Sequence, residues 1–419
     1  MPIVCGTDLS PASSGALAVA RALAAQRGDR EVVLVHVIED AAANPANLAE
    51  LGARLSAQAH GAAGPGPEVR AELVTGPVDP ALVEFAQTSG SDLIVIAAQS
   101  RSEHAARLGT TTAKVIARTH VPVIAVRDPA PWLAFARGTA PLKILLGIDD
   151  SATCDLGIQW TVALGHRGPI DVVLGAIYYP DDAAAHYGLP ARTLVDADPE
   201  IERLIQRDLI RRFGGSAAAS RVTSCARHGL GRIGDHMIEL ARDLQVDAIV
   251  VGTGQKTGLD RLGSVSSVII EDAPQSVVCV PPQAIVVTQT VPVLSQALVA
   301  TDLSQFANRA VPYAFALTQP GGQVHLLHVV KEDAHVDEAV LLRRLAALAP
   351  VGATQTLTVH IARGDEPAVT MAQCAARLGV DVICIASHGR SGITRALVGS
   401  VADRLLRLTR LPVLVLRPA

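Results

Sequence analysis

Residues 380–392 read Val-Asp-Val-Ile-Cys-Ile-Ala-Ser-His-Gly-Arg-Ser-Gly, and Gly399-Ser400 follows them. The apolar run at 380–385 is typical of a parallel-sheet strand that is covered on both faces. The glycines and serines after it predict a loop, and the amphipathic segment 401–410 predicts a helix. A strand, a glycine-rich loop and a helix start, in this order, present backbone N–H groups to an anion.

The same order of elements occurs three times in the 419 residues. The apolar runs are 2–7, 31–38, 69–74, 92–97 and 121–126 in copy 1; 143–148, 170–178, 221–226, 248–252 and 276–280 in copy 2; and 298–304, 323–330, 356–361, 380–386 and 411–416 in copy 3. Helical patterns separate the runs, so each copy predicts a doubly wound, five-stranded parallel-sheet α/β domain with right-handed crossovers. The predicted domains are 1–130, 141–284 and 293–419, with proline-rich linkers at 128–141 and 281–292.

Composition narrows the class of protein. Hydrophobic residues make up 49% of the chain and aromatic residues 3%, which favours sheets covered by helices over an aromatic-rich β-sandwich. The net charge of −4 gives no reason to expect nucleic acid or an anionic membrane as a partner. The six cysteines form no CxxC pair, the N-terminus lacks the features of a signal peptide, and no apolar stretch approaches the ~18 residues of a membrane span. We therefore expect a cytoplasmic protein with no membrane partner.

The motifs of copy 3 resemble those of the universal stress protein family. Asp302 follows the first strand, His328-Val329 lies in the second, and Gly389 with Gly399-Ser400 has the spacing of the family motif Gly-x2-Gly-x9-Gly-Ser/Thr. The resemblance covers nearly the whole chain as three tandem domains. It implies the adenine-nucleotide α-hydrolase-like fold, in which the motif binds the ribose and phosphates of ATP, with or without Mg²⁺, or of AMP or ADP. It also implies a role as a stress-response sensor or regulator.

The resemblance assigns a nucleotide site to copy 3. Its residues are Ala300, Thr301, Asp302, Val329, Ala386, Ser387, Gly389, Arg390, Gly399, Ser400 and Val401. Ala386 departs from the motif, because it replaces the first glycine. The chemistry is suitable: Gly389 lets backbone N–H groups approach phosphate, Arg390 neutralises charge, and Ser400 is expected to cap a helix whose next residues donate free N–H groups.

Copies 1 and 2 have lost parts of this motif. Copy 2 retains a weaker second site, formed by Asp149, Gly252, Lys256, Gly263 and Ser264, but Gln255 replaces the second glycine and the loop is shorter. Copy 1 has no glycine at 97–103 and carries Glu103 where phosphate is expected, so we expect a structural role for it. Because both copies predict the same fold without the glycines, the glycines of copy 3 favour a ligand over a turn.

Two other function classes stay open. The first is a nucleotide-free structural, interaction or chaperone-like module, in which the glycines are only turn residues. The second is an enzyme of the wider α-hydrolase-like group, or at most a slow ATPase. Neither catalytic residues nor metal ligands are expected, because no nucleophile–base pair and no Cys/His cluster has suitable spacing.

The terminal strands predict the assembly. In the family that the chain resembles, the last strand of one domain pairs antiparallel with that of another. An apolar edge strand needs a partner or a cover, and of the three runs 121–126, 276–280 and 411–416 only two can pair within one chain. We therefore expect one intrachain pair and a homodimer through 411–416, with a monomer whose edge is covered by a linker as the alternative.

Overall fold

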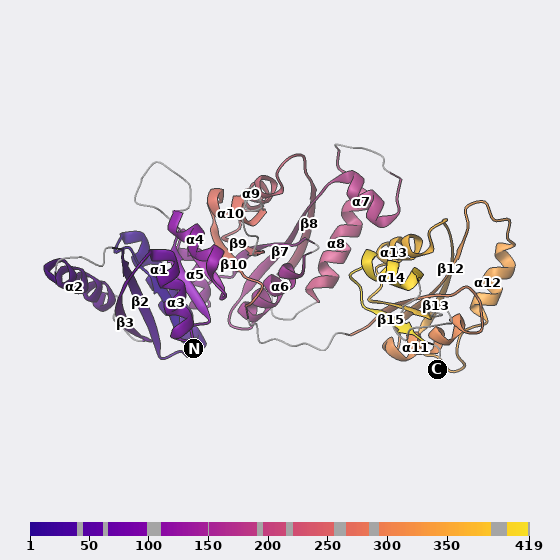
Figure 1. Cartoon of the computed structure of the whole chain (residues 1–419), viewed down its shortest axis with the longest axis horizontal. Helices are drawn as coiled ribbons and strands as arrows, with labels where there is room; N and C mark the ends of the chain where they lie inside the picture. The colour runs from indigo at the N-terminus through magenta and orange to yellow at the C-terminus, as the bar shows by residue number, and fades with distance from the viewer. Residues whose placement is uncertain are drawn as a thin grey trace. The chain divides into compact units, whose positions relative to one another are not determined.

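The computed structural model of the chain describes residues 1–39, 45–61, 66–98, 110–149, 151–190, 196–214, 221–254, 265–284, 293–386 and 400–417. It divides into two compact units, whose elements are labelled in Figure 1. Unit 1 comprises Met1–Tyr179 and Ile205–Thr288, and unit 2 comprises Pro180–Leu204 and Gln289–Ala419. In the described part of the chain, no helix combines the length and the apolar character needed to cross a membrane.

Unit 1 begins with copy 1, in which strands and helices alternate. The elements are β1 (Ile3–Gly6), α1 (Pro11–Arg27), β2 (Glu31–Ile38), α2 (Pro45–Gly61), β3 (Glu68–Thr75), α3 (Val78–Thr88), β4 (Leu93–Ala97), α4 (Thr110–Arg118) and β5 (Val123–Val126). Neighbouring strands pair in parallel in the order β3-β2-β1-β4-β5. This order winds outward from β1 in both directions, as the alternation of elements predicts.

Copy 2 repeats this order after a short helix, α5 (Ala130–Ala136). It consists of β6 (Leu142–Gly147), α6 (Ala152–Gly165), β7 (Ile170–Tyr178), α7 (Pro180–Tyr187), α8 (Pro199–Phe213), β8 (Arg221–His228), α9 (Ile233–Asp243), β9 (Ala248–Gly252), α10 (Val265–Asp272) and β10 (Ser276–Val280). The boundary between the units places α7 in unit 2 and falls within α8.

The last strands of copies 1 and 2 join their sheets. β5 pairs antiparallel with β10, and Ile124 lies opposite Val278 at the centre of the pair. The result is one ten-stranded sheet in the order β3-β2-β1-β4-β5-β10-β9-β6-β7-β8. The prediction that two copies pair within the chain is confirmed.

Copy 3 forms the five-stranded parallel sheet of unit 2, in the order β13-β12-β11-β14-β15. Its elements are β11 (Gln296–Ala300), the 3₁₀ helix η2 (Ala307–Arg309), α11 (Ala310–Leu317), β12 (Gln323–Val330), α12 (Glu338–Ala346), β13 (Thr356–Arg363), α13 (Pro367–Leu378), β14 (Val382–Ala386), α14 (Ser400–Leu408) and β15 (Val413–Leu416). The expected fold class is therefore confirmed, with the first two sheets merged into one.

Each sheet is covered on both faces. In unit 1, buried residues of α1, α5 and α6 form one apolar cluster with the sheet, and those of α3, α4, α9 and α10 form the other. In unit 2, α11 and α12 contribute to one cluster, and α13 and α14 to the other. Burial on both faces explains why the strands read as continuous apolar runs.

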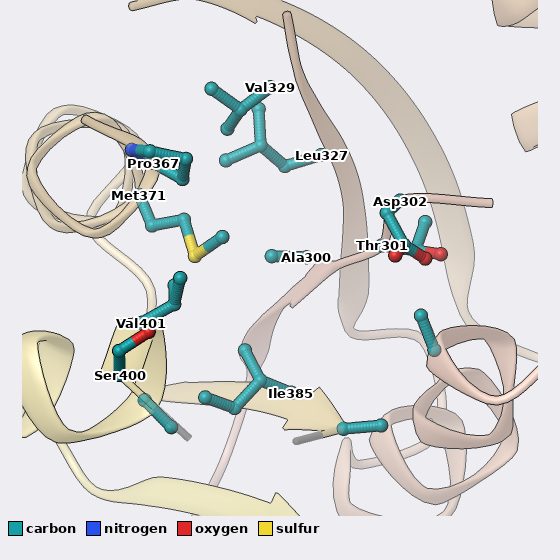
Figure 2. Close-up of a pocket in the computed structure, with 13 residues that line it drawn as sticks. Ala300, Thr301, Asp302, Leu327, Val329, Pro367, Met371, Ile385, Ser400 and Val401 are labelled. Atoms are coloured by element: carbon teal, nitrogen blue, oxygen red, sulfur yellow. The ribbon is translucent and has the colours of Figure 1, made fainter. Parts of the chain in front are cut away.

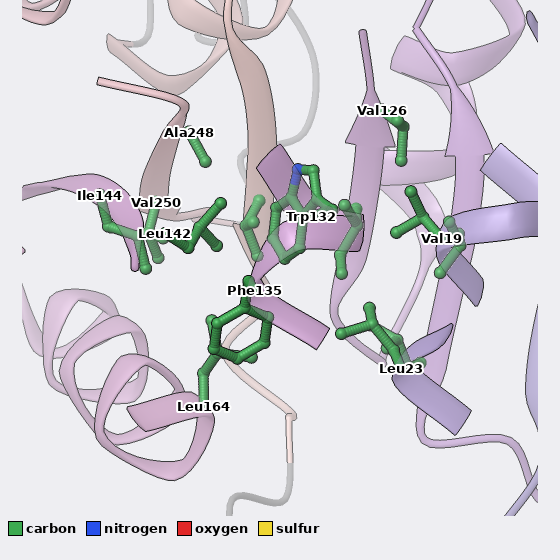
Figure 3. Packing of buried hydrophobic residues seen from close by; sticks show 14 of the residues in the cluster. Val19, Leu23, Val126, Trp132, Phe135, Leu142, Ile144, Leu164, Ala248 and Val250 are labelled. Carbon is green, nitrogen blue, oxygen red and sulfur yellow. The ribbon is translucent and has the colours of Figure 1, made fainter. Parts of the chain in front are cut away.

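The segment 128–141 corrects the sequence analysis, which treats it as a linker. Its helix α5 buries Trp132 and Phe135 completely. Figure 3 shows these two rings between Val19 and Leu23 of α1 and Leu142 and Leu164 of copy 2, and all six residues belong to one cluster. The flanking prolines suggested an extended connection, but two aromatic residues spaced i, i+3 bury enough apolar surface to stabilise a short helix.

Candidate functional site

A cavity of about 320 Å³ opens in unit 2 at the carboxyl ends of β11, β12 and β14. Its wall contains Ala300, Thr301, Asp302, Ala307, Leu327, Val329, Pro367, Met371, Ile385, Ala386, Ser400, Val401 and Ala402. Figure 2 shows the apolar side chains on the strand and α13 sides, with the oxygen atoms of Thr301 and Asp302 at one side and Ser400 at another. The volume falls in the range of small-molecule sites, and the carboxyl strand ends are where doubly wound folds bind ligands.

The cavity brings together the predicted residues of copy 3 that the structure describes. Seven of them line it: Ala300, Thr301, Asp302, Val329, Ala386, Ser400 and Val401. Ser387, Gly389, Arg390 and Gly399 lie outside the described residues, as do Lys256, Gly263 and Ser264 of copy 2. Segments 296–302, 323–330, 382–386 and 400–402 therefore converge on one place, although up to about a hundred residues separate them in the sequence.

A tight turn positions Thr301 and Asp302 after β11. Asp302 Oδ1 accepts a hydrogen bond from Ser304 N at 2.9 Å, and Thr301 Oγ1 accepts one from Leu303 N at 2.9 Å. Leu303 adopts φ 64°, a left-handed conformation that such a turn imposes on a non-glycine residue. Copy 1 builds the same turn from Thr7, Asp8 and Leu9, and Asp149 of copy 2 accepts from Ser151 N at 2.7 Å. The aspartate thus has a structural role in every copy, and in copy 3 it also lines the cavity.

The histidine of the His328-Val329 pair supports this turn from β12. His328 Nδ1 donates to the backbone oxygen of Thr301 at 2.8 Å, as His36 Nδ1 does to Thr7 in copy 1. Copy 2 has Ala176 at the corresponding strand position, and an alanine side chain cannot provide this support. Val329 points into the cavity instead, because neighbouring strand residues face opposite sides of the sheet.

Helix α14 contributes a second polar part of the wall. Ser400 is the first residue of this helix, whereas the sequence analysis expected it to cap the helix from the position before it. Ser400, Val401 and Ala402 line the cavity. The first N–H groups of a helix have no partner within the helix, and the helix dipole makes this end positive. This wall therefore favours an anionic group, while the apolar wall opposite favours a flat ring.

Sequence reasoning missed six residues of the wall: Ala307, Leu327, Pro367, Met371, Ile385 and Ala402. Leu327, Ile385 and Ala402 read as core residues, and Leu327 is fully buried from solvent. Pro367 and Met371 belong to α13, for which the sequence carries no ligand signal. The only indication in the sequence is their position at the start of the helix that follows the third strand of the copy.

The corresponding turn of copy 2 is held by neighbouring side chains. Cys154 Sγ donates to Asp149 Oδ1 at 2.9 Å, and Arg212 of α8 donates to the backbone oxygens of Asp149 and Ser151, the latter at 2.9 Å. Burial raises the pKa of Asp149, but hydrogen bonds from Cys154 and Ser151 and the nearby Arg212 outweigh it, so the pKa lies below its ordinary value. Burial and the bond to Asp149 raise the pKa of Cys154 to about 11. This thiol stays protonated at neutral pH and is a structural donor, not a nucleophile.

The chain resembles known proteins over most of its length. The model of the universal stress protein family matches residues 1–127, 142–281 and 295–417. A universal stress protein of Mycobacterium tuberculosis strain H37Rv is 26% identical over 305 residues, 67% of this chain and 98% of that protein. A universal stress protein structure from Archaeoglobus fulgidus DSM 4304 aligns with TM-score 0.46 and 14% identity, over 66% of this chain and 97% of that one. A universal stress protein solved in complex with cAMP aligns with TM-score 0.27 and 20% identity, over 30% of this chain and all of that one.

The chain belongs to the universal stress protein family. The family model matches it three times, once in each copy, and together the matches cover most of the sequence.

Proposed function

We propose that copy 3 binds ATP or another adenine nucleotide, ADP or AMP, in the cavity of unit 2, and that the protein acts as a stress-response sensor or regulator. The observation that carries the proposal is the convergence of an apolar wall, the Thr301-Asp302 turn and the start of α14 on one cavity. The apolar residues suit adenine, the carboxylate of Asp302 suits ribose hydroxyls, and the helix start suits phosphate.

The proposal is for binding, with hydrolysis at most a slow side reaction. The side chains in the described wall include one carboxylate and two hydroxyl groups, Asp302, Thr301 and Ser400. The Thr301 hydroxyl already donates to Asn308 Oδ1 at 2.7 Å, so it is held as a structural group. Mg²⁺, if it accompanies ATP, would be bound through the phosphates and Asp302. The free cysteines, five of them buried, agree with our proposal of a reducing, cytoplasmic location.

Ser400→Asp tests the site. A carboxylate at a helix start stabilises the helix but repels phosphate, so the fold survives and affinity falls at least about tenfold. The matched control is Thr110→Asp, which places the same charge at the start of α4 in copy 1. ATP and AMP dissociation constants from calorimetry, with circular dichroism as the check of folding, decide the matter. Equal affinities in both variants would contradict the assignment.

The nucleotide-free alternative has its own test. Mass spectrometry of denatured protein, purified without added ligand, is expected to release ATP, ADP or AMP. If nothing is released and millimolar ATP leaves the melting temperature unchanged, the protein is a structural or interaction module. The regulatory role predicts that a Ser400→Asp allele reproduces the stress phenotype of a deletion, whereas Thr110→Asp does not.

We also propose that the protein is a homodimer through β15. The supporting observation is an apolar side chain six or seven residues before each terminal strand, namely Ile116, Ile270 and Leu406. Ile116 and Ile270 are 4% and 6% exposed beside the paired strands β5 and β10, but Leu406 is 46% exposed beside β15. β15 itself is an edge strand of half-buried apolar residues, whereas β5 and β10 are buried throughout. Unit 2 thus presents the kind of surface that unit 1 has already paired.

The β5–β10 register predicts the contacts of the dimer. Ile124 faces Val278 at its centre, and Leu414 holds the corresponding position in β15, so Leu414 residues of two copies should meet at a two-fold axis. Leu414→Cys is expected to form an interchain disulfide on mild oxidation, because directly opposite residues lie about 4.5–5.5 Å apart at Cβ. Val351→Cys, at a fully exposed position, is the control. Light scattering that gives the mass of one chain at micromolar concentration would contradict the dimer.

A further inference from the structure

The helix that follows the third strand of each copy carries a large side chain at its fifth position. The helices are α3, α9 and α13, and the residues are Leu82, Met237 and Met371. Each helix lies over the same face of its sheet, on the side where copy 3 has its cavity. The three side chains can therefore be compared directly.

In copy 2 this side chain lies over two glycines. Gly147 and Gly175 are paired across β6 and β7, and a Cβ atom built on them would lie 3.0 and 3.5 Å from Met237 Cε. Met237 is only 3% exposed. Its thioether end therefore occupies the space that side chains on these two strand positions would otherwise take.

Copy 1 is closed in a similar way. Gly6 ends β1, and a Cβ atom built on it would lie 3.0 Å from Leu82 Cδ2 and 2.9 Å from Ile96 Cγ2. Leu82 is 3% exposed. A branched side chain here fills the space above the strand end, as Met237 does in copy 2.

Copy 3 differs on the strands, although the helix residue is again methionine. The corresponding strand pair is Ala300 and Leu327, and both side chains line the cavity with Met371. Met371 packs against the cluster that contains these two residues, with its thioether end towards Ala300 (Figure 2), but it is half-buried, whereas Met237 is buried. The space between the strand ends and α13 remains open.

We infer that Met237 and Leu82 are the residues that close copies 2 and 1 to ligand, so that each chain offers one open nucleotide site among three related domains. The inference rests on the proposed function for the identity of the ligand, but the packing of Leu82 and Met237 over the strand ends is independent of that function. A second constriction supports it in copy 2: a Cβ atom on Gly252 would lie 2.5 Å from the backbone oxygen of Thr153, so α6 approaches the end of β9 closely. Copy 3 has Ala386 at that position.

The decisive variant is Met237→Ala, with Met371→Ala as its matched control at the same helix position. Removing a fully packed methionine leaves an apolar void, and apolar voids bind xenon. Crystals of Met237→Ala pressurised with xenon should show the atom between β6, β7 and α9, where wild-type crystals show none. The melting temperature of unit 1 should fall by about 5 °C or more, whereas Met371→Ala shifts that of unit 2 by less than about 2 °C.

Ligand stoichiometry gives the second measurement. Equilibrium dialysis with ATP should give one molecule per wild-type chain, and two or three per chain would overturn the inference. Absence of xenon from the copy 2 site of a folded Met237→Ala protein would also overturn it. If the wild type binds no ATP, the proposed function fails, while the xenon result still decides whether Met237 fills the site.

Discussion

Unit 1 and unit 2 are built from the same five-stranded fold, yet they differ at two places. The first is the terminal strand: β5 and β10 cover each other, whereas β15 lies at a sheet edge. The second is the space above the carboxyl ends of the strands, where Leu82 and Met237 pack over strand glycines in unit 1 and where unit 2 has a cavity. Copies 1 and 2 thus pair their terminal strands with each other, whereas the terminal strand of copy 3 lies at a sheet edge.

The largest expected effect comes from breaking the scaffold. Trp132→Ala removes a fully buried ring from the cluster that connects copies 1 and 2, and should lower the free energy of unfolding of unit 1 by about 3–5 kcal/mol. Trp160, the other tryptophan, also lies in unit 1, so its fluorescence reports this transition in urea. Tyr313→Ala in unit 2 is the control, because this side chain is 51% exposed. If Trp132→Ala lowers the free energy of unfolding by less than about 1 kcal/mol, α5 connects copies 1 and 2 without stabilising unit 1.

The next largest expected effect is a loss of stability of unit 2 at acidic pH. His325 Nδ1 lies 3.0 Å from His360 Nε2 on neighbouring strands. Burial and the His360 charge lower the pKa of His325 to about 4, and burial and Arg377 lower that of His360. The unfolded chain therefore binds more protons below about pH 6.5, so unit 2 loses stability as the pH falls from about 6.5 towards 4, by about 2–3 kcal/mol.

Hydrogen exchange followed by mass spectrometry on peptides of β12 and β13 measures this loss. His325→Gln should reduce it, whereas His335→Gln, at an exposed loop position, should leave it unchanged. Equal pH dependence in all three proteins would show that the buried pair is not its source.

A smaller effect tests the close approach in copy 2. Gly252→Ala places a Cβ atom 2.5 Å from the backbone oxygen of Thr153 and should cost about 1–3 kcal/mol, because backbone must move. Gly254→Ala is the control, since no heavy atom lies within 4 Å of the position that its Cβ would take. Urea unfolding of both variants checks the difference. If Gly252→Ala is as stable as the control, the copy 2 site is no tighter than that of copy 3, where Ala386 is native.

The sequence determined the fold class and predicted several of the residues that line the cavity. Period and composition are local properties, so the apolar runs predicted the sheets. The family resemblance predicted one intrachain pair of terminal strands, which is β5 with β10. Thr301, Asp302, Val329 and Ser400 line the cavity, and the sequence could predict them because the family motif gives their positions relative to strand ends. Several other predicted site residues, among them Gly389 and Lys256, lie outside the described residues, and their role remains a prediction.

Only the tertiary structure shows which side chains pack over the strand ends of each copy. Leu82, Met237 and Met371 occupy the same helix position and look alike in sequence, as core residues at helical spacing. How closely such a side chain approaches the strands depends on the residues beneath it, Gly147 and Gly175 in one copy and Ala300 and Leu327 in another. These residues come from separate strands, and packing between distant segments leaves no periodic signal in the chain. The sequence analysis did not predict helix α5 for the same reason, because the contacts of Trp132 with distant residues, and not the local sequence, stabilise this helix.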